Sequence, residues 1–364
     1  MDRRKGWAAL AVCCVCVVSV GFCTPSGRQA ALRAGAPILR GSDSAATRIS
    51  AAALGPFSSA AGKEPVRASS FWESFFGLSP RPATVDGILE SLSGDEVFPE
   101  LTGEDLHPIW ATDLHPAGGD GLLEWGGGYI KNRSGLEFDL SELMAGYRPP
   151  ALSGDEPRVL IYHTHSRETY NDTGEAFADP EVTHGNDPAK SVVAVGEVLK
   201  QTLEACGIST LHCTDCFDQS YTGAYYRSDD ALAAYLEQYP SLSVLIDLHR
   251  DAIYSANGGK YRPVVEKAGL DVAQVMLVCG VGDGEDDDNP HWQENLCFGA
   301  SLQESLERIC PGMTRAMMVY ASSYNQYRSP GAILIEVGTT GNTLTEAKRA
   351  AFYIALALNG MKGG

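Results

Sequence analysis

The sequence predicts an α/β fold, with a mainly parallel sheet that has helices on both faces. Beyond Pro157, short runs of aliphatic and β-branched residues alternate with segments in which apolar residues recur at helical spacing. Strands that alternate with helices form βαβ units, and their crossover helices cover both faces of a parallel sheet. The chain has 364 residues, 44% of them hydrophobic, which suffices for a substantial core.

The expected strands lie at residues 159–162, 209–213, 244–248, 275–279 and 332–337. Each is rich in aliphatic residues and bounded by turn-forming residues. A helix is predicted over 188–206, because Asp187 and a following proline form an N-terminal signal and Gly207 is a stop signal. The last helix begins at Thr343, which has Glu346 three residues later in the spacing of a capping box.

The N-terminus indicates export. Basic residues at positions 3–5 precede an uncharged run over 6–22, which fits a secretory signal or a short membrane anchor. No small-x-small cleavage site follows this run, and Phe22 precedes Cys23 where a lipoprotein would carry a small residue. A retained anchor is therefore favoured, and we expect a membrane-anchored, extracytoplasmic protein.

The expected organisation is an anchor or signal peptide over 1–23, a tether and weakly ordered region over 24–150, and a catalytic domain over 151–364. Residues 24–70 are rich in Ala, Ser, Gly and Arg, with little periodicity. Such a segment has too little apolar surface to offset the entropy of ordering it. The part from 86 to 140 has more apolar residues, and we expect it to fold weakly or only against a partner.

Charge and cysteine content exclude some classes of partner and site. The net charge of −18 disfavours nucleic acid as a partner, because phosphate backbones are bound by clustered Lys and Arg. The six cysteines beyond the apolar segment have no spacing typical of a small disulfide-bonded protein. Cys213 and Cys216 form a single C-x-x-C, which alone is a weak sign of a redox pair or zinc site. Ordinary strand-end or disulfide cysteines are the favoured interpretation.

Three predicted strands end in groups that bind metals or move protons. His163, His165 and Glu168 follow the first, His249 ends the second, and Glu336 lies in the third. Carboxyl ends of neighbouring parallel strands meet at one crevice, where open α/β sheets place their active sites. Zinc hydrolysis requires three protein ligands, an open position for water and a carboxylate base.

These strand-end residues predict a zinc site in which His165, Glu168 and His249 are ligands and Glu336 is the general base. Burial on an apolar strand would raise the pKa of Glu336 towards working pH. If the strand continued, His163 and His165 would share a face, so that one binds zinc and the other orients the site. His165 is the favoured ligand of the two.

The chain resembles the stage II sporulation protein P family over residues 157–360. The matching residues, in order, are Tyr162-His163-Thr164-His165, Glu168-Thr169-Tyr170, Asp247-Leu248-His249-Arg250-Asp251-Ala252, Glu294-Asn295-Leu296, Tyr324-Asn325-Gln326, Leu334-Ile335-Glu336-Val337-Gly338 and Asn342-Thr343-Leu344. The resemblance implies a zinc amidase fold of the phosphorylase/hydrolase-like kind and cleavage of the N-acetylmuramoyl-L-alanine amide of peptidoglycan, with associated cross-link endopeptidase cleavage. It also implies a role at the engulfing membrane of sporulating cells, in the intermembrane space, with stage II sporulation proteins D and M as partners.

Four further residues are candidates for substrate binding. Arg250 and Asp251 could bind substrate charges or pair with each other, and Asn325 and Gln326 could orient a peptide or cap a loop. Where the family often has an Arg-Thr-x-Asp-like segment, this chain has residues 184–187, His-Gly-Asn-Asp, which puts a substrate contact there in doubt.

Two other functions remain open from the sequence. The same ligand pattern suits a zinc carboxypeptidase acting on stem peptides, although no terminal-carboxylate Arg beyond Arg250 is evident. A non-catalytic cell-wall binding module is the second alternative. The intact set of ligands with Glu336 argues against it.

Overall fold

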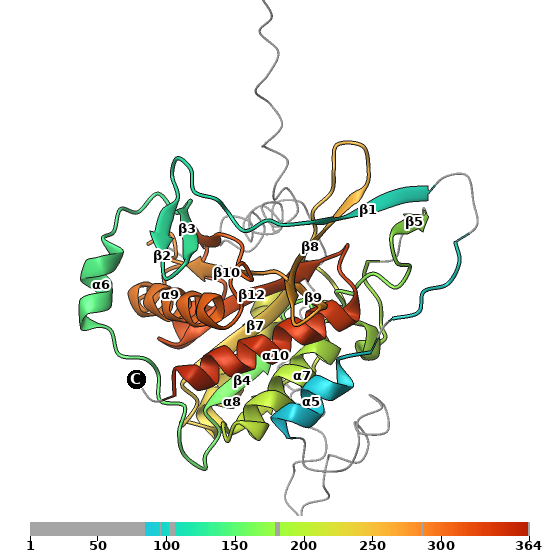
Figure 1. The fold of residues 1–364 in the computed structure, drawn as a ribbon. Helices are drawn as coiled ribbons and strands as arrows, with labels where there is room; N and C mark the ends of the chain where they lie inside the picture. The colour runs from blue at the N-terminus through green and yellow to red at the C-terminus, as the bar shows by residue number, and fades with distance from the viewer. Residues whose placement is uncertain (1–83, 95, 102–105, 179–182, 285–286, 363–364) are drawn as a thin grey trace, which may run out of the picture. The chain divides into compact units, whose positions relative to one another are not determined.

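The computed structural model describes residues 84–94, 96–101, 106–178, 183–284 and 287–362 (Figure 1). The anchor predicted over 1–23 and the tether as far as residue 83 lie outside these residues. The described elements form a mixed α/β fold with two sheets. Within this part of the chain, no helix has the length and apolar character needed to cross a membrane.

The larger sheet positions the site. Its strands, in spatial order, are β2 (Leu123–Trp125), β3 (Gly128–Asn132), β11 (Met317–Tyr320), β10 (Val275–Gly280), β12 (Ala332–Thr339), β7 (Val244–Asp251), β4 (Val159–Tyr162) and β6 (Thr210–His212). β2 pairs antiparallel with β3, and β10 pairs antiparallel with β12. The other neighbours are parallel. β12, β7 and β4 therefore end at the same edge of the sheet.

The smaller sheet has the order β5 (Ala176–Ala178), β1 (Leu106–Thr112), β8 (Lys260–Lys267) and β9 (Leu270–Ala273). The last residue of β12 and the loop that follows it join the smaller sheet to the larger one. Thr339 Oγ1 donates to the carbonyl of Tyr261 at 2.6 Å, and Asn342 Nδ2 donates to the carbonyl of Pro263 at 3.0 Å. These bonds hold β8 beside the end of β12, next to the site.

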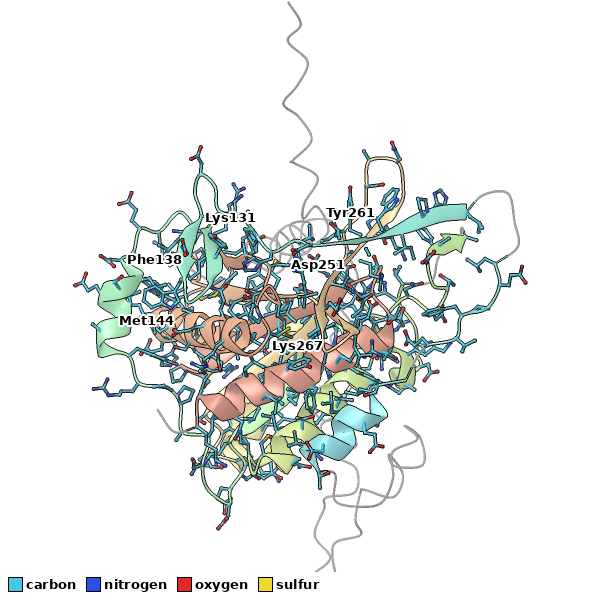
Figure 2. All side chains as sticks on the ribbon, viewed as in Figure 1. Lys131, Phe138, Met144, Asp251, Tyr261 and Lys267 are labelled. Atoms are coloured by element: carbon cyan, nitrogen blue, oxygen red, sulfur yellow. The ribbon has the colours of Figure 1, made fainter. Side chains whose placement is uncertain are left out.

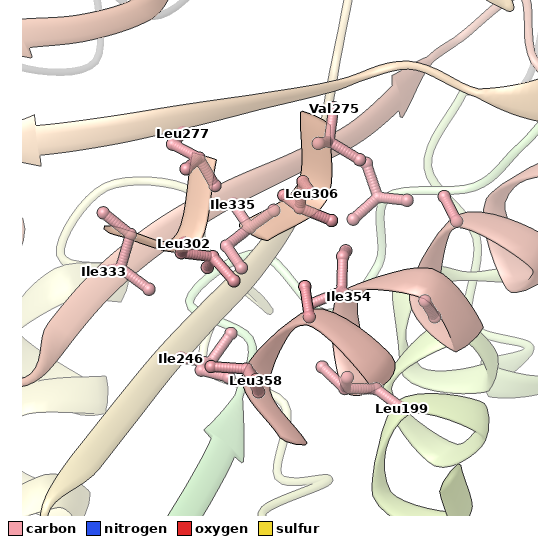
Figure 3. Packing of buried hydrophobic residues seen from close by; sticks show 14 of the residues in the cluster. Leu199, Ile246, Val275, Leu277, Leu302, Leu306, Ile333, Ile335, Ile354 and Leu358 are labelled. Atoms are coloured by element: carbon pink, nitrogen blue, oxygen red, sulfur yellow. The ribbon is translucent and has the colours of Figure 1, made fainter. Parts of the chain in front are cut away.

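The helices are α5 (Val85–Ser91), α6 (Leu140–Gly146), α7 (Val192–Ala205), α8 (Ala224–Gln238), α9 (Trp292–Ile309) and α10 (Leu344–Gly360), with short 3-10 turns η1 (Pro188–Lys190) and η2 (Gln326–Arg328). α7, α9 and α10 cover one face of the larger sheet (Figure 1). The main core lies between them and the sheet. Figure 3 shows Ile246, Ile333 and Ile335 of the strands meeting Leu302, Ile354 and Leu358 of the helices.

The opposite face is covered unevenly. α8 packs there through Leu232 against Leu160 of β4 and Leu245 of β7. Further along this face, Met276, Val278 and Leu334 form a small separate cluster that lines a cavity. A sheet face that is only partly covered by helices leaves room for a ligand.

Most predicted elements are confirmed. The five predicted strands correspond to β4, β6, β7, β10 and β12. The helix expected over 188–206 is divided, because Asp187 caps η1 and Ser191 then caps α7. The predicted capping box of Thr343 and Glu346 is present at the start of α10. Gly207, at φ 72°, follows the end of α7 in a left-handed conformation, as predicted for a stop.

The prediction that residues 24–150 are a tether or weakly ordered is wrong for residues 84–150, apart from the undescribed positions. β2 and β3 extend the larger sheet, and Ile88 of α5 belongs to the main core. Phe138 and Met144 lie at α6 (Figure 2), and the ring of Phe138 is 6.2 Å from that of Trp292 on α9. These short elements depend on distant partners, so their local sequence pattern is weak.

The described cysteines are free thiols. Cys206, Cys213, Cys216, Cys279, Cys297 and Cys310 form no disulfide in this part of the chain. Cys213 is buried, whereas Cys216 is exposed and donates to Asp218 Oδ1 at 3.3 Å. Cys213 and Cys216 of the C-x-x-C are therefore not joined in a disulfide.

Candidate functional site

A cavity of about 440 Å³ lies at the carboxyl ends of β4, β7 and β12. His165, Glu168, His249 and Glu336 all line it. The parallel register places Glu336 of β12 directly beside His249 of β7. The structure thus brings together the four residues that the sequence predicted as ligands and base. Their individual roles remain predictions.

His249 lies between two carboxylates. Its Nε2 is 2.8 Å from Asp247 Oδ1, and its Nδ1 is 3.5 Å from Glu168 Oε2. Burial alone would lower the pKa of His249, but Asp247 and Glu168 outweigh it and raise this pKa well above its ordinary value. The same contact acts on Glu168: burial would raise its pKa, but His249 and Arg250 lower it to about 2. The pair is therefore an imidazolium and a carboxylate at neutral pH.

Asp247 was not among the predicted site residues. It is 1% exposed, and its Oδ1 and Oδ2 accept hydrogen bonds from the backbone N–H and the hydroxyl of Thr164, at 2.9 and 2.7 Å. Nε2 of His249 lies 2.8 Å from this carboxylate without hydrogen-bond geometry, and Nδ1 is the nitrogen that faces Glu168. Strand alternation could have identified Asp247, because residues two apart on a strand share a face.

His165 is 6% exposed and stacks on Tyr221, with ring centroids 4.6 Å apart. Its ring centroid is 5.4 Å from that of His249. Burial lowers the pKa of His165, so the ring is neutral at pH 7. Its buried Nδ1 has no hydrogen-bond partner in the described part of the chain and lies 4.0 Å from Asp218 Oδ2.

The donor chemistry fits a zinc ion. Two imidazoles and a carboxylate are ligands that zinc takes in catalytic sites, and a carboxylate behind a ligating His is the usual supporting arrangement. The buried Nδ1 of His165, without a hydrogen-bond partner among the described residues, is a further sign of an electron-pair acceptor at this point. As they stand, no three His, Cys, Asp or Glu side chains among the described residues form a ready-made metal site. A metal would have to displace the proton that His249 shares with Glu168.

The expectation that His163 shares a face with His165 is wrong, because the strand ends at Tyr162 and the chain then turns. His163 is fully buried on the side of α7, where it lies against Gly196. Its Nδ1 donates to the carbonyl of Leu248 at 2.9 Å, and its Nε2 is 2.8 Å from Nε2 of His212. His163 does not line the cavity. Both of its nitrogens are engaged, which leaves neither for a metal.

His163 is part of a buried polar chain that the sequence analysis missed. Glu197 Oε2 lies 3.2 Å from Nδ1 of His212, which in turn contacts His163. Because His163 donates through Nδ1, its Nε2 accepts from His212 when its ring is neutral. Burial holds the pKa of His163 well below its ordinary value, which keeps it neutral. The chain ties α7 to the residue immediately before His249.

Asn325 and Gln326 support a loop and do not line the cavity, so their predicted role in substrate binding is wrong. Asn325 Nδ2 donates to the carbonyl of Tyr225 at 2.9 Å, and Gln326 Nε2 donates to that of Val278 at 2.9 Å. Gln326 Oε1 also accepts from the N–H of Gly280 at 2.9 Å. The structure shows the other predicted role of these two residues, which is to cap a loop.

Arg250 and Asp251 line the cavity but do not pair through their side chains. The guanidinium of Arg250 donates to the carbonyls of Thr169 at 2.9 Å and Thr183 at 2.5 Å. Asp251, labelled in Figure 2, accepts from Arg315 at 2.8 Å. Arg250 is therefore largely committed to the protein's own backbone.

Tyrosines form part of the cavity wall, and sequence analysis missed them. Tyr221, Tyr225, Tyr320 and Tyr324 line the cavity beside its floor of Met276, Val278 and Leu334. Tyr324 and the next residue both have a positive φ, 51° and 57°, which is uncommon for residues other than glycine. The side-chain hydrogen bonds of Asn325 and Gln326 hold this strained loop in place.

Three solved structures of amidases are similar to this chain. The CwlD amidase from Clostridioides difficile, solved in complex with the GerS lipoprotein, has 13% identity and a TM-score of 0.34, over 56% of this chain and 98% of that one. The N-acetylmuramyl-L-alanine amidase Ami1 from Mycobacterium smegmatis has 10% identity and a TM-score of 0.34, over 58% and 99%. The N-acetylmuramoyl-L-alanine amidase AmiC2 of Nostoc punctiforme has 11% identity and a TM-score of 0.32, over 58% and 97%.

Sequence comparison identifies the family. Stage II sporulation protein P of Bacillus subtilis (strain 168) is 28% identical over 215 residues, which is 56% of this chain and 50% of that protein. The chain thus matches about half the length of this curated relative. The family model of Stage II sporulation protein P (SpoIIP) matches residues 128–359, which include every residue of the cavity. The chain belongs to the Stage II sporulation protein P family.

Proposed function

We propose that this protein is a zinc-dependent peptidoglycan hydrolase of sporulation that cleaves the amide between N-acetylmuramic acid and L-alanine. The observation that carries the proposal is the convergence of His165, Glu168, His249 and Glu336 on one cavity, in a member of this family. His165, Glu168 and His249 would hold the zinc ion. When bound, zinc polarises the scissile carbonyl and makes water more acidic.

The remaining chemistry belongs to the protein's own residues. Asp247 orients His249 through Nε2, so that Nδ1 faces the ligand position. Glu336, 5% exposed and beside His249, accepts the proton of the attacking water and passes it to the leaving nitrogen of L-alanine. The amide C–N bond breaks, and the products are a lactyl carboxylate and a free L-alanine amine.

The experiment that tests the proposal identifies which bond the protein cuts. Purified full-length protein, loaded with zinc, is incubated with purified sacculi, and the soluble products are analysed by mass spectrometry. Stem peptides with a free L-alanine amine and intact glycan strands support the proposal, and split cross-links would add endopeptidase cleavage. Release of free D-alanine alone would identify a carboxypeptidase. If the zinc-loaded protein binds the sacculi but releases no product, it is a binding module.

We also propose that the protein acts outside the cytoplasm, anchored through residues 1–23, together with stage II sporulation proteins D and M. The apolar run of the sequence and family membership support this. Membrane fractionation of sporulating cells tests the anchor, because a truncation that lacks residues 1–23 should move to the soluble fraction. Co-purification with tagged protein D or M tests the partners.

A further inference from the structure

Arg167 is a cation at the cavity that the proposed mechanism does not use. It lines the cavity together with Thr183 and His184. The other arginine there, Arg250, donates to the carbonyls of Thr169 and Thr183. Arg250 is thus occupied, whereas the guanidinium of Arg167 has no ion pair or hydrogen bond with the described residues, and its buried Nε has no acceptor among them.

The backbone of Arg167 is fixed on both sides. Its N–H donates to Asp218 Oδ2 at 3.3 Å, and its carbonyl accepts from the N–H of Gly185 at 2.9 Å. Asp218 is already an acceptor for Ser166 at 3.1 Å and for Cys216 at 3.3 Å. The carboxylate that binds the backbone of Arg167 thus serves other donors as well. A positioned guanidinium whose buried nitrogen lacks an acceptor among these residues is suited to a carboxylate supplied by a ligand.

Another part of the cavity lining has a different character. Its floor of Met276, Val278 and Leu334 and its tyrosine wall offer apolar and aromatic surface. The cavity is therefore lined by charged groups of both signs near the end of β4, where Glu168 and Asp218 accompany Arg167, and by apolar side chains near β10. A substrate with a carboxylate on one arm and a sugar ring on the other has one favoured orientation in it.

We propose that Arg167 binds the α-carboxylate of the second residue of the stem peptide, the γ-linked D-glutamate, and so sets the orientation of the substrate. This inference depends on the proposed function for its substrate. Arg167 lines the same cavity as the proposed ligands, so its partner belongs to the part of the substrate next to the scissile bond. L-Alanine has no free carboxylate within the stem, and the first one beyond the scissile amide is that of D-glutamate. The sugar arm then lies over the apolar floor.

The test uses two muramoyl peptides that differ only at this carboxylate, which is free in one and amidated in the other. Binding is measured by calorimetry on the full-length, zinc-loaded Glu336→Gln protein, so that no turnover is required. The free carboxylate should bind about tenfold to a hundredfold more tightly, the range expected for a charge-assisted pair. Adding Arg167→Gln should reduce this preference to less than about threefold, and Arg167→Lys should keep part of it.

Arg148→Gln is the matched control, because Arg148 is exposed and its guanidinium donates only to the neighbouring carbonyl of Tyr147 among the described residues. It should leave the preference unchanged. An Arg167→Gln protein that keeps the full preference, or a parent protein that shows none, would overturn the assignment. Failure of the proposed function is seen separately, as lack of cleavage by the protein with Glu336 intact, while the binding preference still decides the role of Arg167.

Discussion

Replacing Asp247 with Asn tests how the site is organised. Asp247 accepts two hydrogen bonds from Thr164, at 2.9 and 2.7 Å, and contacts His249 Nε2 at 2.8 Å. Asn has one acceptor oxygen in place of two, so its amide N–H₂ would face either the hydroxyl of Thr164, which would then have to accept, or the backbone N–H of Thr164 and Nε2 of His249. Since all of these atoms are buried, an unsatisfied donor should cost about 1–3 kcal/mol of unfolding free energy. His249 would also lose the carboxylate that orients it, which should weaken zinc binding about tenfold to a hundredfold.

The assay combines urea unfolding of the metal-free protein with competition for zinc against a chromophoric chelator. Asp251→Asn is the control, because Asp251 is likewise buried and pairs with Arg315 at 2.8 Å without contacting His249. It should lower stability by a similar amount and leave zinc affinity within about threefold, since of these two carboxylates Asp247 alone contacts the proposed ligand His249. Equal zinc affinity in Asp247→Asn and wild type would refute the orienting role of Asp247. Equal losses in both variants would show that the effect is general destabilisation.

Two further predictions concern stability. Burial lowers the pKa of Lys260 from 10.5 to about 8, so the unfolded chain binds more protons between these values and the stability from this group rises with pH. Urea unfolding at pH 7 and pH 10 should show a gain for wild type relative to Lys260→Met; parallel changes in both proteins would contradict it. Gly338→Ala should cost more than the roughly 1–2 kcal/mol of a left-handed backbone, because the new Cβ would lie 2.8 Å from Asn342 Oδ1. Gly269→Ala, also at positive φ but with open space around it, should cost only the backbone part, and equal losses would argue against the clash.

The sequence predicted the strands of the site because β4, β7 and β12 are long or uniformly apolar runs that are buried on both faces. It also predicted the convergence of His165, His249 and Glu336, since parallel neighbours end together. His163 was misplaced because alternation holds only inside a strand, and the chain leaves the strand after Tyr162. The local sequence pattern does not show to which side a turn after the strand directs each of the two histidines.

Other features depend on contacts that are remote in sequence. β3 is held by pairing with β11, almost two hundred residues later, and α5 by burial against α7 and α10. The commitment of Arg250 to the carbonyl of Thr183 and the lack of such a partner for Arg167 among the described residues follow from the same kind of long-range packing. The sequence therefore identified which residues form the site. Which of its charged side chains are paired within the protein could be seen only in the structure.

The central claim is that His165, Glu168 and His249 hold zinc while Glu336 moves protons, and one paired measurement tests it most directly. Zinc content and turnover of peptidoglycan are determined for Glu336→Gln and His249→Ala proteins purified in parallel. Glu336→Gln should keep its zinc while turnover falls by about two to four orders of magnitude, the contribution of a positioned general base. His249→Ala should lose zinc to a chelator that leaves wild type loaded, because two ligands hold the metal weakly. Full zinc in His249→Ala, or near-normal turnover by Glu336→Gln, would contradict the account.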